Sequence, residues 1–402
     1  MNKRIYEASF VFLRYLIDYE KLLNIKSFDD VNESNIKDII TEFNLVNKND
    51  FLVNIFDHLN FIIREDELKE KLDAIKKLDF SNKNSYERVF KDINYHSKNA
   101  SSPFISKVIY DIIKNENRSY NNILDPTMGY GNFLIDLNKK LNVNIINGIE
   151  VDYTTFNLAK MNFYLSGLNN KKLNITNIDS LLETFKEESL FDLIVSDPPL
   201  IMPKEKYDNL IIKNKFDEYY DYPKTSLSDF SFILNNINKL SDDGIYITTA
   251  HPRLLFRDIN KDVRKKIVEE NLIDTIIRLP RGIYYNPFIN IYILFFKMNK
   301  KTEDIFIIDY QNESITKSNE ERLLYEIKDI YNNKLIIKDR SKYIHKQEII
   351  DNDYNLNLTR YQNKILSDNI DLLEKIEENK KFKKKLNEKI VITDDIIHKL
   401  LK

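Results

Sequence analysis

The stretch Asp125-Pro126-Thr127-Met128-Gly129-Tyr130-Gly131-Asn132-Phe133-Leu134 follows a short apolar segment, Asn122-Ile123-Leu124. It places a carboxylate at the end of a predicted strand, then two glycines two residues apart, and then the start of a predicted helix. Because glycine has no side chain, the backbone of such a loop can approach a ligand closely. Dinucleotide-binding domains and ordinary turns also contain such glycines, so the neighbouring segments have to decide between these interpretations.

Helices and strands alternate after Phe104, and three further predicted strands end beside an acidic residue. Glu150 follows strand 145–149, Asp179 follows strand 173–178, and Asp197 comes just after strand 191–195. In an open sheet of parallel strands these carboxyl ends line one crevice, which is where ligands bind. Later predicted strands lie at 245–249, 273–279, 289–296 and 305–309. The pattern predicts an α/β, Rossmann-like sheet that ends in an antiparallel hairpin.

The second informative stretch is Ser196-Asp197-Pro198-Pro199-Leu200. Consecutive prolines fix the backbone and remove two N–H donors, which leaves Asp197 and the Pro198 carbonyl as acceptors for an amine. The exocyclic amine of adenine is a poor nucleophile, because its lone pair is delocalised into the ring. Two acceptors can pyramidalise it for attack on a sulfonium methyl group, so positioning and electrostatics suffice without a metal ion or a histidine base. A plain Pro-Pro turn is the alternative, but its position after the glycine loop and the acidic strand ends favours the chemical interpretation.

These stretches resemble the N6-adenine DNA methyltransferases, and in particular the modification (M) subunits of type I restriction-modification systems. That family carries Asp-Pro-x-x-Gly-x-Gly-x-Phe-Leu, followed by Asn- or Asp-Pro-Pro-aromatic, in the order found here. Further stretches that resemble it are Phe12–Leu16, Ser102-Pro103, 252–257, 279–284 and 353–361. The resemblance therefore covers most of the chain.

The resemblance implies S-adenosyl-L-methionine as the cofactor. The glycine loop is implied to frame its methionine part, Glu150 to bind its ribose and Asp179 its adenine amine. The residues implied to bind the cofactor are Ser102, Asp125, Gly129, Tyr130, Gly131, Phe133, Glu150 and Asp179. The residues implied to hold the target amine are Asp197, Pro198, Pro199 and Leu200.

Leu200 departs from the family pattern, which has Phe or Tyr at this position to stack on a base flipped out of the duplex. Stacking on an aromatic ring is worth about 1–3 kcal/mol per base. Three hypotheses follow. In an active enzyme, Leu200 packs against the base, or Tyr207, Tyr219 or Tyr220 supplies the ring. In a degenerate subunit, the chain binds cofactor and partners without transferring methyl groups. The third, which the long family resemblance argues against, is methylation of a protein glutamine or an RNA amine.

The charge balance bears on partners, because 61 lysines and arginines stand against 63 aspartates and glutamates, for a net charge of −2. A DNA enzyme without a basic surplus needs a local basic face or a partner that supplies phosphate contacts. The resemblance implies double-stranded DNA and a DNA-specificity subunit as partners, with a second copy of the chain and a restriction subunit in the same complex. There is no cysteine, and the first residues fit neither a signal peptide nor a membrane span. We therefore expect a cytoplasmic protein that does not enter a membrane.

The chain is long enough for three regions. We predict a helical amino-terminal domain over residues 1–95, a methyltransferase domain over 96–335, and a helical carboxy-terminal assembly region over 336–402. In the last region Leu366, Ile370, Leu373 and Ile376 recur at helical spacing beside a lysine-rich run, 380–385. In the resembling subunits such helices pack on the specificity subunit, and a solvated surface helix is the alternative.

Overall fold

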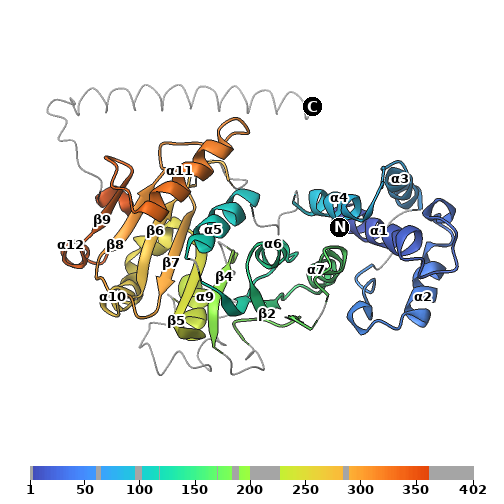
Figure 1. Ribbon diagram of the computed structural model, residues 1–402, viewed down its shortest axis with the longest axis horizontal. Helices are drawn as coiled ribbons and strands as arrows, with labels where there is room; N and C mark the ends of the chain where they lie inside the picture. Colours follow the sequence, from blue (N-terminus) through green and yellow to red (C-terminus); the bar gives the residue numbers. More distant parts are fainter. Residues whose placement is uncertain are drawn as a thin grey trace, which may run out of the picture. The chain divides into compact units, whose positions relative to one another are not determined.

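A nine-stranded mixed sheet, counted over the described residues, forms the centre of the chain (Figure 1). The computed structural model describes residues 3–59, 65–95, 102–116, 118–169, 171–182, 190–199, 227–283 and 289–361. The strand order is β3-β2-β1-β4-β5-β7-β6-β8-β9. The strands are β1 Tyr120–Asp125, β2 Val143–Ile149, β3 Leu173–Thr176, β4 Phe191–Ser196, β5 Leu240–Ala250, β6 Ile273–Arg278, β7 Tyr292–Lys297, β8 Ile305–Asp309 and β9 Ser341–Ile344.

The strands from β3 to β5 are parallel to one another, whereas β7 pairs antiparallel with both β5 and β6. Parallel strands are covered by helices on both faces, which explains why they read as nearly continuous apolar runs. In β1, Ile123 and Leu124 are fully buried, and in β4 the same holds for Leu193, Ile194 and Val195. The predicted parallel sheet with an antiparallel hairpin of β6 and β7 is confirmed.

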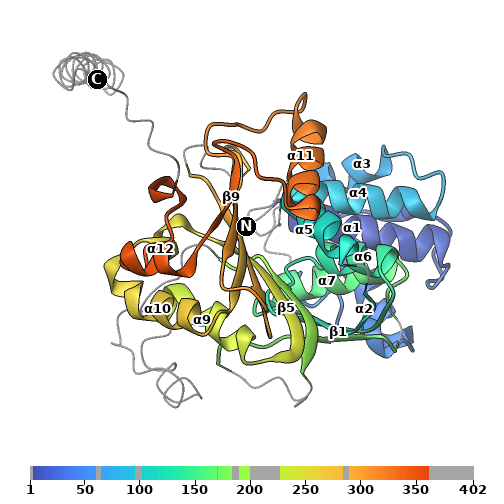
Figure 2. The same ribbon diagram turned by 60° about the vertical axis from the view of Figure 1, so that its left-hand side comes forward.

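Helices cover both faces of the sheet, as Figures 1 and 2 show. One face carries α5, α6, α7 and α11, and the other carries α9, α10 and α12. The helices after the amino-terminal region are α5 Pro103–Asn115, α6 Asn132–Lys140, α7 Tyr153–Leu165, α9 Leu227–Ile237, α10 Lys261–Glu269, α11 Glu320–Asn333 and α12 Lys346–Asp351. Within the described ranges, no helix has both the length and the apolar character needed to cross a bilayer.

The amino-terminal region is helical, with α1 Lys3–Arg14, α2 Ile36–Val46, α3 Glu65–Lys76 and α4 Lys83–Tyr95. The stretch 10–17 is helical, and every residue there except Arg14 is buried. The cause is that α1 packs against α3, α4 and α7 at once. The helix also changes to a π-helix over Tyr15–Tyr19. Together with the sheet, this confirms the predicted α/β Rossmann-like fold with a helical amino-terminal region; the predicted tail helix lies outside the described residues.

Two parts of the sheet differ from the sequence-based expectation. The predicted strand 245–249 is longer than expected, because β5 begins at Leu240 and contains an irregularity: Phe191 pairs with Leu240, and the next paired residue, Leu193, lies opposite Ile245. The predicted strand 305–309 is β8, which pairs in parallel with β6, and one further strand, β9, pairs antiparallel with β8. The boundaries at 95/96 and 335/336 stay predictions, while the chain forms one compact unit over Met1–Arg360.

Candidate functional site

Asp125 ends β1 at the point where the strand order reverses between β1 and β4. Its side chain is only 3% exposed, and its Oδ1 accepts the backbone N–H of Thr127 at 3.0 Å. Burial raises the pKa of the Asp125 carboxyl to about 8, with the Thr127 N–H acting against this shift and the carboxylates of Asp197 and Glu150 adding to it. Such a reversal of strand order is where open α/β sheets bind ligands. The carboxyl therefore lies in a buried, electronegative crevice.

The glycine loop is held against the end of the next strand, β2. The Met128 N–H donates to the Ile149 carbonyl at 2.9 Å, and the Gly129 N–H donates to Glu150 Oε2 at 3.0 Å. Gly131 has a φ of +74°, and a Cβ built there would lie 2.3 Å from Cζ of the buried Phe163 ring. Only glycine satisfies both conditions, so the loop can fold tightly against α7.

The next two acidic residues follow β2 and β3. Glu150 is half-buried, and its second carboxylate oxygen accepts the Asp152 N–H at 2.8 Å. Burial raises the pKa of the Glu150 carboxyl, and the Asp152 and Gly129 N–H groups act against the shift. Asp179 accepts the Leu181 N–H at 3.1 Å and is also half-buried. Both carboxylates are oriented by backbone donors.

Asp197 leaves β4, the strand next to β1 on the other side of the strand-order reversal. The Thr249 hydroxyl, at the carboxyl end of β5, donates to Asp197 Oδ1. Beneath the Pro-Pro turn the side chains form a relay in which Asn236 donates to Tyr246, Tyr246 to Ser196, and Ser196 to Thr248. All four are buried, so the backbone that leads into Asp197 is rigidly supported.

The remaining predicted site residues differ in how they are placed. Ser102 precedes α5 and accepts the Ser106 N–H on its carbonyl at 3.1 Å. Phe133 lies in the first turn of α6 and is buried in the sheet core. Pro198 is half-buried and Pro199 exposed, while Leu200 lies outside the described residues. Tyr130, also predicted to bind the cofactor, is buried in a different place. It is 5% exposed, and its ring packs in the core of the amino-terminal helices.

Sequence reasoning missed Thr249, Asn162 and Asn177. Asn177 Nδ2 donates to the Glu150 carbonyl at 2.7 Å, and Asn162 Nδ2 donates to the Tyr130 carbonyl at 2.8 Å. Thr249 could have been found from its position at the end of the strand that follows the Pro-Pro stretch. The two asparagines carry no such signal, since the chain is rich in asparagine throughout.

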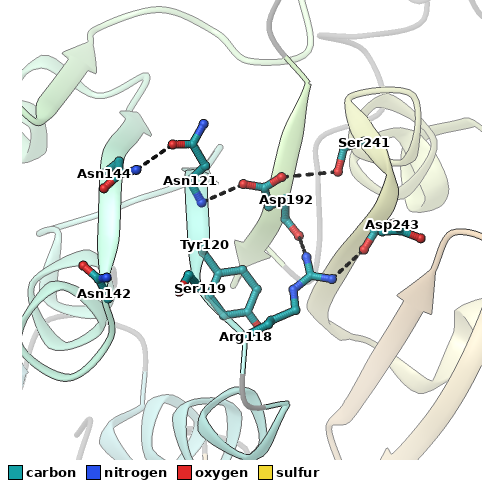
Figure 3. Close-up of a pocket in the computed structure, with 9 residues that line it drawn as sticks. All are labelled: Arg118, Ser119, Tyr120, Asn121, Asn142, Asn144, Asp192, Ser241 and Asp243. Carbon is teal, nitrogen blue, oxygen red and sulfur yellow. Dashed lines mark hydrogen bonds between the residues drawn. The ribbon is translucent and has the colours of Figure 1, made fainter.

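A cavity of about 390 Å³ lies at the amino-terminal ends of β1, β2, β4 and β5, opposite the acidic crevice (Figure 3). Arg118 donates to the carbonyls of Asp192 at 2.9 Å and Asp243 at 2.8 Å, and Asp192 accepts the Asn121 N–H at 2.7 Å. Figure 3 shows these groups facing one another across the strand ends. Their hydrogen bonds tie β1, β4 and β5 together, so this cavity has a structural explanation.

The raised pKa of Asp125 predicts how stability depends on pH. The unfolded chain loses this proton near pH 4 and the folded chain near pH 8, so the folded chain binds more protons between these values. The free energy of unfolding therefore falls as the pH rises through this window. Asp125→Asn removes the titration but keeps an oxygen for the Thr127 N–H. We expect its melting temperature, relative to that of the native chain, to increase from pH 5 to pH 9; a constant difference would contradict this.

Comparison with known proteins agrees with this geometry. The model of the family described as N-6 DNA Methylase matches residues 86–369. The type I restriction enzyme MpnII methylase subunit of Mycoplasma pneumoniae is 28% identical over 75% of this chain and 62% of its own length. The MjaVIII methylase subunit of Methanocaldococcus jannaschii is 29% identical over 74% of this chain and 55% of its own length. The chain thus spans less than two thirds of both curated relatives.

The fold is also found among solved structures. The methyltransferase subunit of a type I restriction-modification system from Streptococcus thermophilus superposes with a TM-score of 0.69 at 20% identity, covering 89% of this chain and 92% of its own. The family model covers well over half of the chain, including all the strand ends described above. The chain therefore belongs to the N-6 DNA methylase family.

Proposed function

We propose that this chain is a DNA adenine methyltransferase subunit that transfers a methyl group from S-adenosyl-L-methionine to the exocyclic amine of adenine. One observation carries the proposal. Four acidic residues lie at or just after the carboxyl ends of four adjacent parallel strands, and so along the same side of the sheet: Asp125, Glu150, Asp179 and Asp197. The first three suit the cofactor, and Asp197 with the Pro-Pro turn suits the amine.

The charge of the crevice supports this cofactor. Burial and neighbouring carboxylates raise the pKa of Asp125, so the crevice favours a ligand that brings positive charge. S-adenosyl-L-methionine carries a sulfonium and an ammonium group. Glu150 is already oriented by two N–H donors, and its free lone pairs can accept ribose hydroxyls. The cofactor supplies the methyl group; the chain's residues orient it and the amine.

The proposed target chemistry rests on Asp197. Its carboxylate is fixed by the Thr249 hydroxyl, and the two prolines that follow contribute no N–H that could compete for the Pro198 carbonyl. Two fixed acceptors align the amine with the sulfonium methyl, which is the kind of preorganised electrostatic catalysis that needs no metal ion. Formation of the nitrogen–carbon bond would break the bond between the methyl carbon and the sulfonium sulfur, so the cofactor would leave as the neutral thioether, and the methylated amine would lose one proton to solvent.

We propose a type I restriction-modification complex as the setting. The relatives named above are type I methylase subunits, and a chain with net charge −2 suits phosphate contacts borrowed from a DNA-specificity subunit. Double-stranded DNA, that subunit, a second copy of this chain and a restriction subunit are the proposed partners. Purified chain that methylates a defined sequence rapidly by itself would contradict the partner requirement.

A substitution at Leu200 distinguishes the hypothesis of an active enzyme from the hypothesis of a degenerate subunit. If the native chain is active, Leu200→Phe adds a stacking surface worth about 1–3 kcal/mol, so we expect base binding, read as 1/KM for DNA, to improve about fivefold or more. Methylation is measured on genomic DNA that lacks the modification, with the chain and the proposed DNA-specificity subunit. Activity that appears only in Leu200→Phe would favour the degenerate subunit, whose role is to bind cofactor and partners.

The proposed function is tested by measuring cofactor binding and by mapping the methylated base in DNA. Titration calorimetry of the full chain with S-adenosyl-L-methionine should show one site, and sequencing that detects modified bases should place N6-methyladenine at a fixed DNA sequence. Methyl groups recovered on a protein glutamine or on RNA instead would replace the DNA proposal by the third hypothesis.

A further inference from the structure

Tyr130 lies at the centre of the glycine loop, yet it points away from the sheet core. Its neighbours in the loop, Met128 and Phe133, are buried in the core of the sheet. The Tyr130 ring is buried in a different core, which is otherwise formed by residues of the amino-terminal helices and one face of α7. Within six residues the loop is therefore fixed in two separate cores.

Helix α7 separates these two cores. Ala159 and Phe163, four residues apart, belong to the core of the sheet. Leu158, Met161 and Leu165 follow the i, i+3, i+7 spacing of another face and belong to the helical core with Tyr130. The helix is buried on both faces, so a change in the helical core can reach the loop through α7.

Polar contacts strengthen the same connection. Asn162, fully buried on α7, donates to the Tyr130 carbonyl at 2.8 Å and to Asn132 Oδ1 at 2.7 Å. Two residues earlier on α7, Lys160 donates to the Val53 carbonyl of the amino-terminal region at 3.0 Å. The Tyr164 ring lies edge-on to Phe12, with ring centroids 5.8 Å apart. These contacts fix the loop backbone relative to helices that are distant in sequence.

We propose that Tyr130 is a positioning residue that anchors the cofactor loop in the amino-terminal helical core, and that this anchor at Tyr130 sets cofactor affinity. This inference rests on the proposed cofactor. Because coupling between two events is reciprocal, cofactor binding also stabilises the helical core around Tyr130. The Tyr130 ring packs in the helical core, and it acts on the cofactor site through the backbone of Gly129 and Gly131.

The test compares three full-length variants. Tyr130→Ala removes the anchor, and Tyr130→Phe keeps the ring. Phe43→Ala is the control, because Phe43 is fully buried on α2 in the same core but is not part of the loop or of α7. The measurements are the Kd for S-adenosyl-L-methionine by titration calorimetry, and hydrogen exchange of amides 127–133 without cofactor.

We expect Tyr130→Ala to raise the Kd about tenfold and to speed exchange of the loop amides. Tyr130→Phe should bind within about threefold of the native chain, and Phe43→Ala should lower the melting temperature with the Kd and loop exchange nearly unchanged. In the native chain, cofactor should slow exchange in α1 and α4, and this effect should be lost in Tyr130→Ala.

Native Kd and native loop exchange in Tyr130→Ala would overturn the proposal, as would an equal rise of the Kd in Phe43→Ala. If the native chain binds no S-adenosyl-L-methionine, the proposed function fails instead. The exchange of the loop amides, measured without cofactor, then still decides whether Tyr130 anchors the loop.

Discussion

Asp197→Ala is expected to lower the rate of methyl transfer by about a hundredfold or more while leaving the Kd for S-adenosyl-L-methionine nearly unchanged. The reason is that alanine removes the fixed acceptor for the target amine, and the loss of one preorganised electrostatic group in an active site typically costs a factor of about 100 to 1000. Single-turnover methylation of DNA and titration calorimetry measure the two quantities separately.

Two further variants sharpen this prediction. Asp197→Asn keeps an oxygen that can accept both the amine and the Thr249 hydroxyl, so it should retain far more activity than alanine. Asp192→Asn is the matched control, because Asp192 lies at the other end of β4, beside the cavity of Figure 3. Its effect should be on stability alone. Equal loss of transfer in Asp192→Asn and Asp197→Ala would assign the effect to folding.

Gly131→Ala is expected to abolish measurable cofactor binding and to lower the free energy of unfolding by about 2–5 kcal/mol. A left-handed backbone at a residue with a side chain costs about 1–2 kcal/mol. The added Cβ would also lie 2.3 Å from the buried Phe163 ring, and overpacking of this kind costs about 1–3 kcal/mol. Relief requires the loop to move away from α7, which displaces the Gly129 N–H from Glu150.

Gly167→Ala isolates the backbone contribution. Gly167 has a φ of +76°, close to that of Gly131, but a Cβ built there meets nothing within 4 Å. Chemical denaturation of both variants should show a smaller loss for Gly167→Ala, with normal cofactor binding. If the two variants lose the same stability and both bind cofactor, the close packing of the glycine loop on α7 is not important for the site.

The acidic strand ends were predictable because of how parallel strands are buried. Helices on both faces make each strand an apolar run, so Glu150 and Asp197 stand out as the first charged residues after such runs. The order of the strands then brings these acidic residues to the same end of the sheet. The sequence indicates this strand order only indirectly, through the short connections between the strands.

Other features depend on contacts between distant segments, which no local pattern records. The direction of Tyr130 is decided by a core whose other members come from residues 6–90 and from α7. The contact between Thr249 and Asp197 requires β5 to lie beside β4. Arg14 is the one charged residue in the stretch 10–17, and its guanidinium donates to the Ile75 carbonyl at 2.6 Å inside the helical region.

The most direct test of the account is the fate of a labelled methyl group. The full chain, purified with the proposed DNA-specificity subunit, is incubated with S-adenosyl-L-methionine labelled in the methyl group and with unmodified genomic DNA. The account predicts label in N6-methyladenine with the native chain, and about a hundredfold less with Asp197→Ala. Absence of label in DNA for both the native chain and Leu200→Phe, with cofactor binding intact, would contradict it.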